Sequence, residues 1–291
     1  MKKGRIVKLV GGQYTVMDKD KNKVVVKPLG KFRHIDIAPK VGDMVTFNED
    51  HIVAVEDRKN DLARPPVTNV DQAILIHSAK EPEFSFFLLD RFLVLVEHES
   101  IKPVIVVTKI DLLDDPELEA LKKKLAYYET YYDVYFTSIH DDQTHEVIKT
   151  LIRDSVSVFA GQTGSGKSSL LNALDIRLSL ETGEISKALG RGKHTTRHSE
   201  LLDIHGGLVA DTPGFSKLDF YTIDLDHLHH CYPDFLALSE SCKFRGCYHI
   251  NEPGCAVKKA VDEGLVPAQR YTHYALIYDE IKNQKKLYRK K

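Results

Sequence analysis

The sequence predicts a multidomain α/β protein with an all-β barrel at its N-terminal end and a small, mostly helical segment at its C-terminal end. Five short strand patterns fall within the first 55 residues, and after a proline-containing break apolar strands alternate with amphipathic helices. A chain of 291 residues can form two domains with sizeable cores and a small appendage. We place the domains at residues 1–64, 67–220 and 221–291.

The N-terminal segment contains five short strand patterns separated by turns rich in glycine and aspartate. The strands are expected at residues 5–10, 14–17, 24–27, 44–47 and 52–55. So many strands in so short a segment favour the five-stranded oligonucleotide-binding (OB) barrel, which closes most sheet edges and offers a face and loops to nucleic acid. An SH3-like barrel fits the pattern nearly as well.

Basic residues concentrate at the two ends of a chain whose overall net charge is −1. Residues 1–40 hold 11 basic and three acidic residues, a net charge of +8, and residues 282–291 hold six basic residues and no acidic one. Contacts from Lys and Arg to phosphate supply most non-specific affinity for nucleic acid, so we expect the barrel to bind RNA. For the tail, an ordinary solvated surface explains the charge equally well.

The sequence also bears on membranes and export. No stretch approaches the run of about 18 apolar residues that spans a bilayer, and no long apolar segment follows the basic start. We therefore expect a soluble, cytoplasmic protein with no membrane partner.

Arg64-Pro65-Pro66 interrupts regular structure and marks a linker, after which the pattern becomes that of a doubly wound α/β sheet. Because strands and helices alternate from there on, the sheet is expected to be parallel. The expected strands are residues 73–77, 104–107, 134–136, 155–160 and 207–210. The expected helices are residues 86–97, 116–128, 144–153 and 168–174.

Residues 161–168 have the form G-x-x-x-x-G-K-[ST] between a strand and a helix, the setting of a phosphate-binding loop. The glycines allow successive N–H groups to turn inward, and the helix adds its positive N-terminal end. Lys167 should reach the terminal phosphates, and the Ser168 hydroxyl should hold Mg²⁺. A glycine-rich turn without a ligand would not require all four fixed positions. The expected nucleotide-binding residues here are Gly161, Gln162, Thr163, Gly164, Ser165, Gly166, Lys167, Ser168 and Ser169.

Two further stretches complete the expected phosphate end of the site. Asp211-Thr212-Pro213-Gly214 follows a strand, which places Asp211 near the magnesium ion and Gly214 near the γ-phosphate. Alone, Asp-x-x-Gly is usually just a turn. Residues 190–197 are polar and glycine-punctuated, as in a switch loop, and we favour Thr196 over Thr195 as a magnesium ligand. A flexible basic loop that touches RNA is the alternative.

Thr108-Lys109-Ile110-Asp111 follows a strand and resembles the Asn-Lys-x-Asp motif of GTPases. There the Asp carboxylate accepts both the guanine N1–H and the exocyclic amine, a donor pair that adenine lacks. This motif is why GTP is expected rather than ATP. Thr108 replaces the usual Asn, which removes an amide that ties the motif to the phosphate loop. Ser138 and Ile139 resemble the last guanine-contact motif, with Ile139 where Ala is usual.

The order of these motifs is unusual, because the guanine-reading elements precede the phosphate loop and the Asp-Thr-Pro-Gly. The set resembles a circularly permuted GTPase domain. With a barrel before it and cysteines after it, the whole chain resembles the ribosome small subunit-dependent GTPase A family. The resemblance implies GTP and GDP as substrate and product, Mg²⁺, and a late assembly factor that binds the small ribosomal subunit and its ribosomal RNA. Such a factor has its GTPase activated there and leaves after hydrolysis; for this role we expect a monomer.

Phe215 departs from many GTPases, which place a water-orienting Gln after the corresponding glycine. A phenyl ring neither donates nor accepts a proton, so the attacking water must be positioned otherwise. His194 is our hypothesis for the catalytic residue, because it lies in the expected switch loop and its side chain can orient water. An ordinary surface histidine explains it equally well.

Three of the four cysteines and one histidine form the pattern C-x4-C-x-H-x5-C. Three thiolates and an imidazole make a tetrahedral zinc set, and four protein ligands leave no position for a catalytic water, so the ion would be structural. The spacings are not those of common zinc fingers, and the family resemblance also places one Zn²⁺ here. Disulfides are the alternative, and Cys231 is expected to be a buried free thiol. The expected zinc ligands are Cys242, Cys247, His249 and Cys255.

Two other functions compete with a GTPase acting on the assembling small subunit. An RNA-binding nucleotide sensor with negligible hydrolysis would explain Phe215. An ATP-dependent small-molecule kinase would share the phosphate loop but would leave residues 108–111, residues 211–214 and the barrel unexplained.

Overall fold

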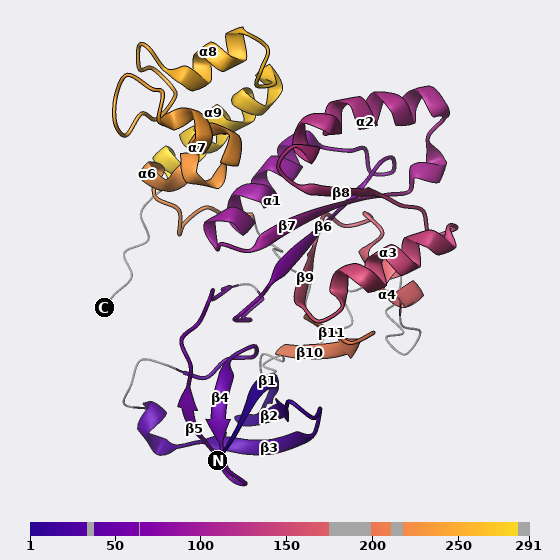
Figure 1. Cartoon of the computed structure of the whole chain (residues 1–291), viewed down its shortest axis with the longest axis vertical. Coiled ribbons are helices and arrows are strands. Elements are labelled where there is room, and N and C mark those ends of the chain that lie inside the picture. The colour runs from indigo at the N-terminus through magenta and orange to yellow at the C-terminus, as the bar shows by residue number, and fades with distance from the viewer. Residues whose placement is uncertain (34–37, 64, 175–198, 211–217, 285–291) are drawn as a thin grey trace.

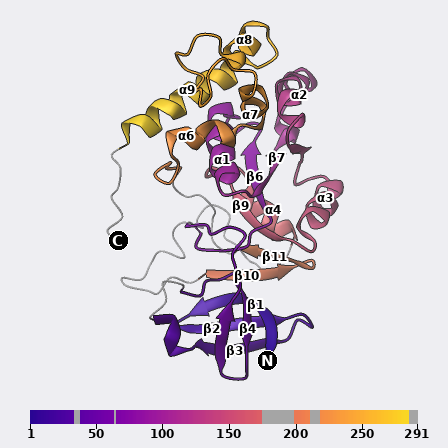
Figure 2. The same cartoon turned by 60° about the vertical axis from the view of Figure 1, so that its left-hand side comes forward.

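A computed structural model describes residues 1–33, 38–63, 65–174, 199–210 and 218–284. Two views of the molecule agree on its arrangement: the barrel lies at one end, the α/β sheet in the middle and the C-terminal helices at the other end (Figures 1 and 2). Among the described residues, no helix is long and apolar enough to cross a membrane.

The N-terminal residues form a closed five-stranded barrel. Its strand order runs β1-β2-β3-β5-β4 and returns to β1, with β3 and β5 parallel. The interior is filled by alternating apolar side chains such as Ile6, Val16, Val45 and Phe47. The structure confirms the expected OB-like barrel. Its strands are β1 (Lys2–Val10), β2 (Gln13–Asp18), β3 (Lys23–Pro28), β4 (Met44–Phe47) and β5 (His51–Val55), with a 3-10 turn, η1, at Gly30–Arg33.

Strand β1 also joins the barrel to the α/β sheet, through a strand that the sequence analysis missed. The β1 register shifts between Ile6 and Lys8, as at a β-bulge. The part before the shift pairs with β4, and the part after it pairs antiparallel with β10 (Ser199–Ile204). The Lys8 Nζ lies 2.6 Å from a carboxylate oxygen of Glu200 across this pairing. The two sheets are therefore continuous.

The middle of the chain forms the expected doubly wound sheet, with strand order β8-β7-β6-β9-β11-β10. All neighbouring strands are parallel except β10, which runs antiparallel to β11. The strands are β6 (Gln72–Ser78), β7 (Lys102–Thr108), β8 (Asp133–Phe136), β9 (Val156–Ala160) and β11 (Gly207–Ala210). The helices are α1 (Phe86–His98), η2 (Ile110–Leu112), α2 (Asp115–Glu129), α3 (Asp142–Ile152) and α4 (Lys167–Leu174).

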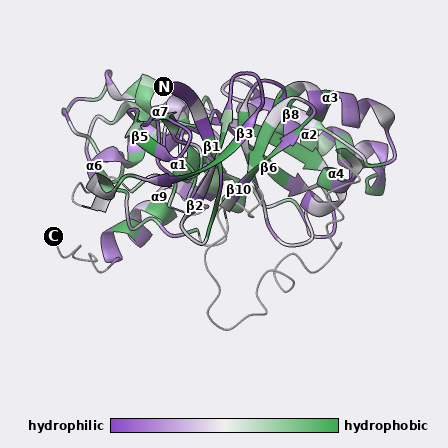
Figure 3. Ribbon diagram, turned by 90° about the horizontal axis from the view of Figure 1, so that it is seen from below, coloured by the Kyte–Doolittle hydropathy of each residue, from purple (hydrophilic) through white to green (hydrophobic). Residues whose placement is uncertain are grey.

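Alternate residues of the parallel strands enter two different cores, because successive side chains point to opposite faces of a sheet. Leu75 of β6 joins the core that contains α1 and α2, whereas Ile74 and Ile76 join the one that contains Ile148 of α3 and Leu170 of α4. Figure 3 shows hydrophobic residues along β6 and more hydrophilic ones on α2 and α3. Helices thus cover both faces of the sheet.

The C-terminal segment is helical, as expected, and packs on α1. Pro267 stands directly before its longest helix, α9, whose Tyr274 and Ile281 are buried while Tyr271 and Tyr278 are partly buried. Aromatic and apolar side chains at three- and four-residue steps therefore pack α9 against the rest of the protein. The elements are α6 (Leu225–Leu228), η4 (His229–Cys231), α7 (Pro233–Ser239), α8 (Ala256–Asp262) and α9 (Ala268–Asn283).

A buried charged network fixes these helices to the α/β sheet. Arg270 of α9 is 2% exposed and donates two hydrogen bonds to Asp234 of α7, at 2.6 and 2.9 Å, and one of 2.6 Å to Asp90 of α1. Tyr128 donates a hydrogen bond of 2.9 Å to Asp90, and Tyr127 donates one of 2.8 Å to Asp234. Nothing in the local sequence pattern indicated this network.

Candidate nucleotide site and metal centre

The expected nucleotide-binding residues that the structure describes gather at the carboxyl edge of the parallel strands. Leu75 of β6 pairs with Ala160, the last residue of β9, and Ser78 pairs with Thr108, the last residue of β7. The phosphate loop therefore begins beside β6, the strand that lies between β9 and β7, and the guanine motif follows β7. This edge is where ligands bind in open α/β sheets.

The phosphate loop has the backbone that its glycines permit. Gly164 and Gly166 have φ angles of +82° and +88°, in the left-handed region. A Cβ atom on Gly161 would lie 2.1 Å from the carbonyl oxygen of Ile76, so no side chain fits there. The first residue of α4 is Lys167, which places the positive helix end directly after the loop.

Lys167 folds back over the loop. Its Nζ donates hydrogen bonds to the carbonyl oxygens of Gly161, at 2.5 Å, and Gln162, at 2.9 Å. Burial lowers the pKa of its ammonium group to about 8. A polyphosphate would exchange these neutral acceptors for anionic oxygens and so stabilise the charged form.

Thr108 ties the guanine motif to the phosphate loop, contrary to the sequence expectation that this link is lost. Its Oγ1 donates a hydrogen bond of 2.7 Å to the carbonyl oxygen of Ser165, and the side chain is 3% exposed. A Cβ atom on Gly166 would also lie 3.4 Å from this hydroxyl. The short hydroxyl side chain replaces the longer Asn because the two segments approach closely.

Beyond Thr108 the guanine motif approaches the surface, with Lys109 and Ile110 half-buried and Asp111 exposed. Lys109 has a left-handed backbone, with φ +58°, and its Nζ donates a hydrogen bond to the carbonyl oxygen of Glu81. Asp111 is exposed in η2, and its carboxylate has no hydrogen-bond partner among the described residues. Such an open carboxylate is what recognition of a guanine N1–H and amine requires.

The segment after β8 supports this motif. The Thr137 backbone N–H donates 2.7 Å to the Val107 carbonyl oxygen, and the Ile110 N–H donates 3.4 Å to that of Thr137. The Ser138 hydroxyl accepts from the His140 N–H at 3.2 Å, while Ile139 is 46% exposed. Ser138 and Ile139 therefore lie beside the guanine motif, but the Ser138 hydroxyl is already engaged.

One buried residue near the loop was missed by the sequence analysis. His77, the residue before the end of β6, is 1% exposed and packs against Phe84 and Phe92, with ring centroids 5.3 and 5.7 Å away. Burial, and secondarily the charge of Lys167, lowers its pKa to about 4, so the imidazole is neutral at physiological pH. Only the tertiary position of β6 beside the loop reveals it.

Four of the expected site residues lie outside the residues that the structure describes: His194, Thr196, Asp211 and Gly214. The described strand β11 ends at Ala210 and runs parallel to β9, with Leu208 opposite Val156. The chain thus reaches the same sheet edge immediately before Asp211.

The four expected zinc ligands come together after α7. One donor atom from each of Cys242, Cys247, His249 and Cys255 lies within 4.8 Å of all the others. This is the one such His, Cys, Asp and Glu group in the described part of the chain. All four cysteines are free in the structure. Cys231 is buried, as expected, and its thiol donates to the His227 carbonyl oxygen.

The surroundings of the four ligands fit a zinc ion. The Nδ1 of His249 lies 3.3 Å from the Cys255 sulfur, so it points into the cluster, while its Nε2 lies 3.1 Å from the Ser239 hydroxyl. A hydrogen bond from the outer nitrogen fixes the tautomer that leaves the inner nitrogen free for a metal. The Ala256 N–H donates to the Cys242 sulfur at 3.3 Å, which stabilises a thiolate. Ser239 is a supporting residue that the sequence pattern did not reveal.

We expect the purified protein to carry about one zinc ion per chain, because three thiolates and one imidazole complete the tetrahedral coordination of a single ion. Cys247→Ala should reduce the zinc content to near zero, measured by elemental analysis, and should lower the midpoint of thermal unfolding. Cys231→Ala serves as the matched control and should retain the ion. Full zinc occupancy in Cys247→Ala would contradict the assignment.

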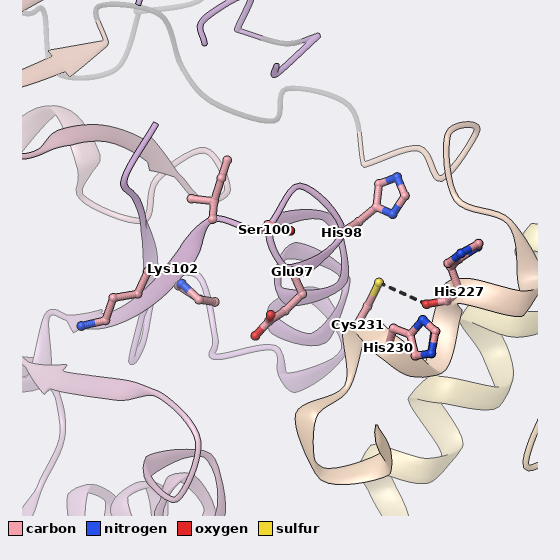
Figure 4. A pocket seen from close by; sticks show the side chains of 9 residues that line it. Glu97, His98, Ser100, Lys102, His227, His230 and Cys231 are labelled. Atoms are coloured by element: carbon pink, nitrogen blue, oxygen red, sulfur yellow. Dashed lines mark hydrogen bonds between the residues drawn. The ribbon is translucent and has the colours of Figure 1, made fainter. Parts of the chain in front are cut away.

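A separate groove of about 580 Å³ lies between the end of α1 and η4 (Figure 4). Glu97 and His98 line one side, and His227, His230 and Cys231 line the other. These side chains form no metal-binding group in the described part of the chain. The groove lies where η4 packs on α1.

Comparison with known proteins gives full-length matches. A model of the RsgA GTPase family matches residues 55–221, and a model of the RsgA N-terminal domain matches residues 3–52. The small ribosomal subunit biogenesis GTPase RsgA of Bacillus subtilis is 49% identical, and that of Bacillus cytotoxicus is 48% identical; each alignment covers 99% of this chain and all of the relative.

Two solved structures share the fold over nearly the whole chain. The crystal structure of YloQ, a circularly permuted GTPase, superposes with a TM-score of 0.85 at 42% identity and covers 98% of this chain and 96% of that one. YjeQ from Thermotoga maritima gives a TM-score of 0.85 at 33% identity, with coverage of 98% and 99%. The permuted motif order expected from the sequence is thus also that of a solved relative.

Proposed function

The chain belongs to the RsgA GTPase family, and from this premise we propose that it binds the small ribosomal subunit late in assembly, hydrolyses GTP to GDP and phosphate there, and then dissociates. The observation that carries the proposal is the meeting of the phosphate loop and the guanine motif at one sheet edge, joined by the Thr108–Ser165 hydrogen bond.

Different residues would bind the phosphates and the base of GTP. Backbone N–H groups of residues 161–166 and the start of α4 would hold the phosphates, with Lys167 neutralising the terminal oxygens. Thr108 keeps the guanine motif at a fixed distance from the loop, and Asp111 reads the base. The loop backbone is already formed, and on binding Lys167 exchanges its two carbonyl partners for phosphate oxygens.

Magnesium completes the phosphate end, where it would neutralise charge that develops on the phosphate oxygens. We assign its ligands to Ser168, Thr196 and Asp211, and a γ-phosphate contact to the N–H of Gly214. Ser168 is the second residue of α4, directly after Lys167, and Asp211 directly follows β11. Serine hydroxyl and carboxylate oxygens are the ligands that Mg²⁺ prefers.

His194 remains our hypothesis for the residue that orients the attacking water, because Phe215 cannot do so. His194→Ala should reduce subunit-stimulated GTP turnover by about a hundredfold and leave GDP affinity unchanged, since general acid–base and orienting groups contribute effects of this size. His205→Ala, which removes a histidine in the turn between β10 and β11, serves as the control. Full stimulated turnover in His194→Ala would exclude the role.

Asp111→Asn should change the base that the pocket accepts. An Asn amide cannot accept both guanine donors, but it can donate to the 2-carbonyl group of xanthine. We expect GDP affinity to fall by at least about tenfold and xanthosine diphosphate affinity to rise, measured by titration with fluorescent nucleotides. Asp115→Asn removes an exposed carboxylate nearby at the start of α2 and should change neither. Unaltered base preference in Asp111→Asn would remove this residue from the pocket.

We propose that the protein acts as a monomer in the cytoplasm and that residues 1–64, 67–220 and 221–291 are its domains. We also propose, from its positive charge, that the barrel contacts ribosomal RNA. Lys2, Lys3 and Lys23 are exposed strand residues of the barrel, as phosphate contacts require.

A nucleotide sensor with negligible hydrolysis is the second candidate, and Phe215 is the feature that favours it. Such a protein would bind GTP through the same loop and guanine motif. It would differ only in turnover on the small subunit, so a hydrolysis measurement separates the two.

A further inference from the structure

An exposed aromatic side chain lies between two basic ones in the loop that joins the first two expected zinc ligands. Lys243, Phe244 and Arg245, which we call the Phe244 tip, lie between Cys242 and Cys247 and are all exposed. The Phe244 ring is 45% exposed and belongs to neither hydrophobic core. A phenyl ring so placed contributes little to folding and is available for contact with a ligand.

The two basic side chains leave the tip positively charged. The Lys243 Nζ lies 5.5 Å from the centroid of the Phe244 ring. In the described part of the chain, neither Lys243 nor Arg245 has a carboxylate within ion-pairing distance. An aromatic face flanked by unneutralised cations suits a ligand that has both a flat ring and negative charge.

The tip is held rigidly from both sides. Its ends are two ligands of the four-residue cluster, and the Lys243 N–H donates 3.1 Å to the Gly254 carbonyl oxygen. A Cβ atom on Gly254 would lie 3.1 Å from the Cβ of Lys243, so this glycine allows the chain segments at residues 243 and 254 to pack closely. A platform fixed in this way loses little conformational entropy when it binds.

We propose that the Phe244 tip binds an unpaired ribonucleotide, with the base stacked on Phe244 and the neighbouring phosphates paired with Lys243 and Arg245. Sequence-tolerant stacking on aromatic residues beside basic groups is how proteins hold single-stranded nucleic acid. A protein partner would call for a wider apolar patch, whereas the neighbours here are two cations and Gly246. The inference rests on the proposed function only in taking ribosomal RNA as the source of the nucleotide.

The Phe244 tip lies in the part of the molecule farthest from the barrel, so a contact there can orient the protein on its partner. The C-terminal helices lie at the end of the molecule opposite the barrel (Figure 1). One nucleotide held there, together with RNA bound at the barrel, fixes the orientation of the α/β sheet between them. Two separated contacts also raise affinity through effective concentration.

The chain contains no tryptophan, so Phe244→Trp introduces a single tryptophan, whose fluorescence can be excited selectively, at the proposed contact. The full-length zinc-loaded variant is titrated with a single-stranded adenosine octaribonucleotide and, separately, with purified small ribosomal subunits. A base stacked on the indole should quench its fluorescence by about half or more. Leu265→Trp, at a 67% exposed position in the same C-terminal segment, is the matched control and should change little.

Affinity measurements complete the test. Phe244→Ala should weaken octamer binding at the tip, and binding to small subunits, by about tenfold, while Phe244→Tyr should restore both because it keeps a ring. Lys243→Ala should reduce the slope of log affinity against log salt by about one, as expected for one lost phosphate contact. Unchanged unfolding midpoints confirm that these exposed substitutions leave the fold intact.

The possible outcomes distinguish failure of the proposed nucleotide contact at the Phe244 tip from failure of the proposed ribosomal role. Absence of quenching by both probes overturns the proposal. A loss of subunit affinity in Phe244→Ala without quenching would place a protein on Phe244 and also overturn it. Quenching by the octamer with no binding of wild-type protein to small subunits would support the tip and refute the proposed ribosomal role.

Discussion

Lys167→Ala should reduce subunit-stimulated GTP turnover by about a hundredfold to a thousandfold, because it removes the only side-chain cation of the described phosphate loop. In the free protein this ammonium group contacts only the carbonyl oxygens of Gly161 and Gln162. Developing charge on the transferred phosphoryl group would therefore lack its main counter-charge. Single-turnover phosphate release with saturating small subunits measures the effect.

Lys149→Ala is the control for this experiment. Lys149 lies on α3 and pairs with Glu146 at 2.8 Å, so the change removes a lysine from the same domain without touching the loop. Its turnover should stay within about twofold of the wild type, because surface ion pairs contribute little. Equal loss of turnover in both variants would mean that Lys167 acts through stability alone.

Arg270→Met should destabilise the protein by about 3–5 kcal/mol, because it leaves the carboxylates of Asp90 and Asp234 buried without their cation. Methionine keeps most of the volume, so the loss reflects charge and hydrogen bonding more than a cavity. Urea unfolding followed by circular dichroism measures the change. Because the network joins α1 to α7 and α9, we expect the C-terminal helices to separate from the sheet first.

Lys122→Met provides the comparison for this prediction. Lys122 forms an exposed i,i+3 pair with Glu119 at 3.0 Å, and such pairs contribute less than about 1 kcal/mol. A loss under about 1 kcal/mol in Arg270→Met as well would show that the buried network adds nothing to the attachment of the C-terminal helices.

The parts of the site that were predictable from sequence are those in which function and local structure share a few adjacent residues. The phosphate loop is one: its glycines, Lys167 and Ser168 lie within eight residues, and the strand and helix around it follow from their own periodicity. The zinc ligands are another, because soft ligands clustered within 14 residues limit the chemistry. In both, the residues predicted from the sequence are those that the structure brings together.

The features that escaped prediction depend on contacts between distant segments. Thr108 was expected to lose its tie to the phosphate loop, yet its hydroxyl reaches Ser165, 57 positions away. Strand β10 was missed because its partners are β11 and the barrel strand β1, and the latter pairing crosses 190 residues. The role of Arg270 could not be predicted from the sequence, since its partners Asp90 and Asp234 lie 180 and 36 positions away.

The most direct test of the central claim is hydrolysis of GTP and of ATP by the purified protein, with and without isolated small ribosomal subunits, at one fixed salt concentration. We expect slow GTP turnover without the subunits and a rise in the GTP turnover rate of at least about tenfold with them. We expect no stimulated turnover of ATP. GTP binding without stimulated hydrolysis would contradict the account and leave a nucleotide sensor, and equal stimulation of ATP would contradict the assignment of Asp111 to guanine.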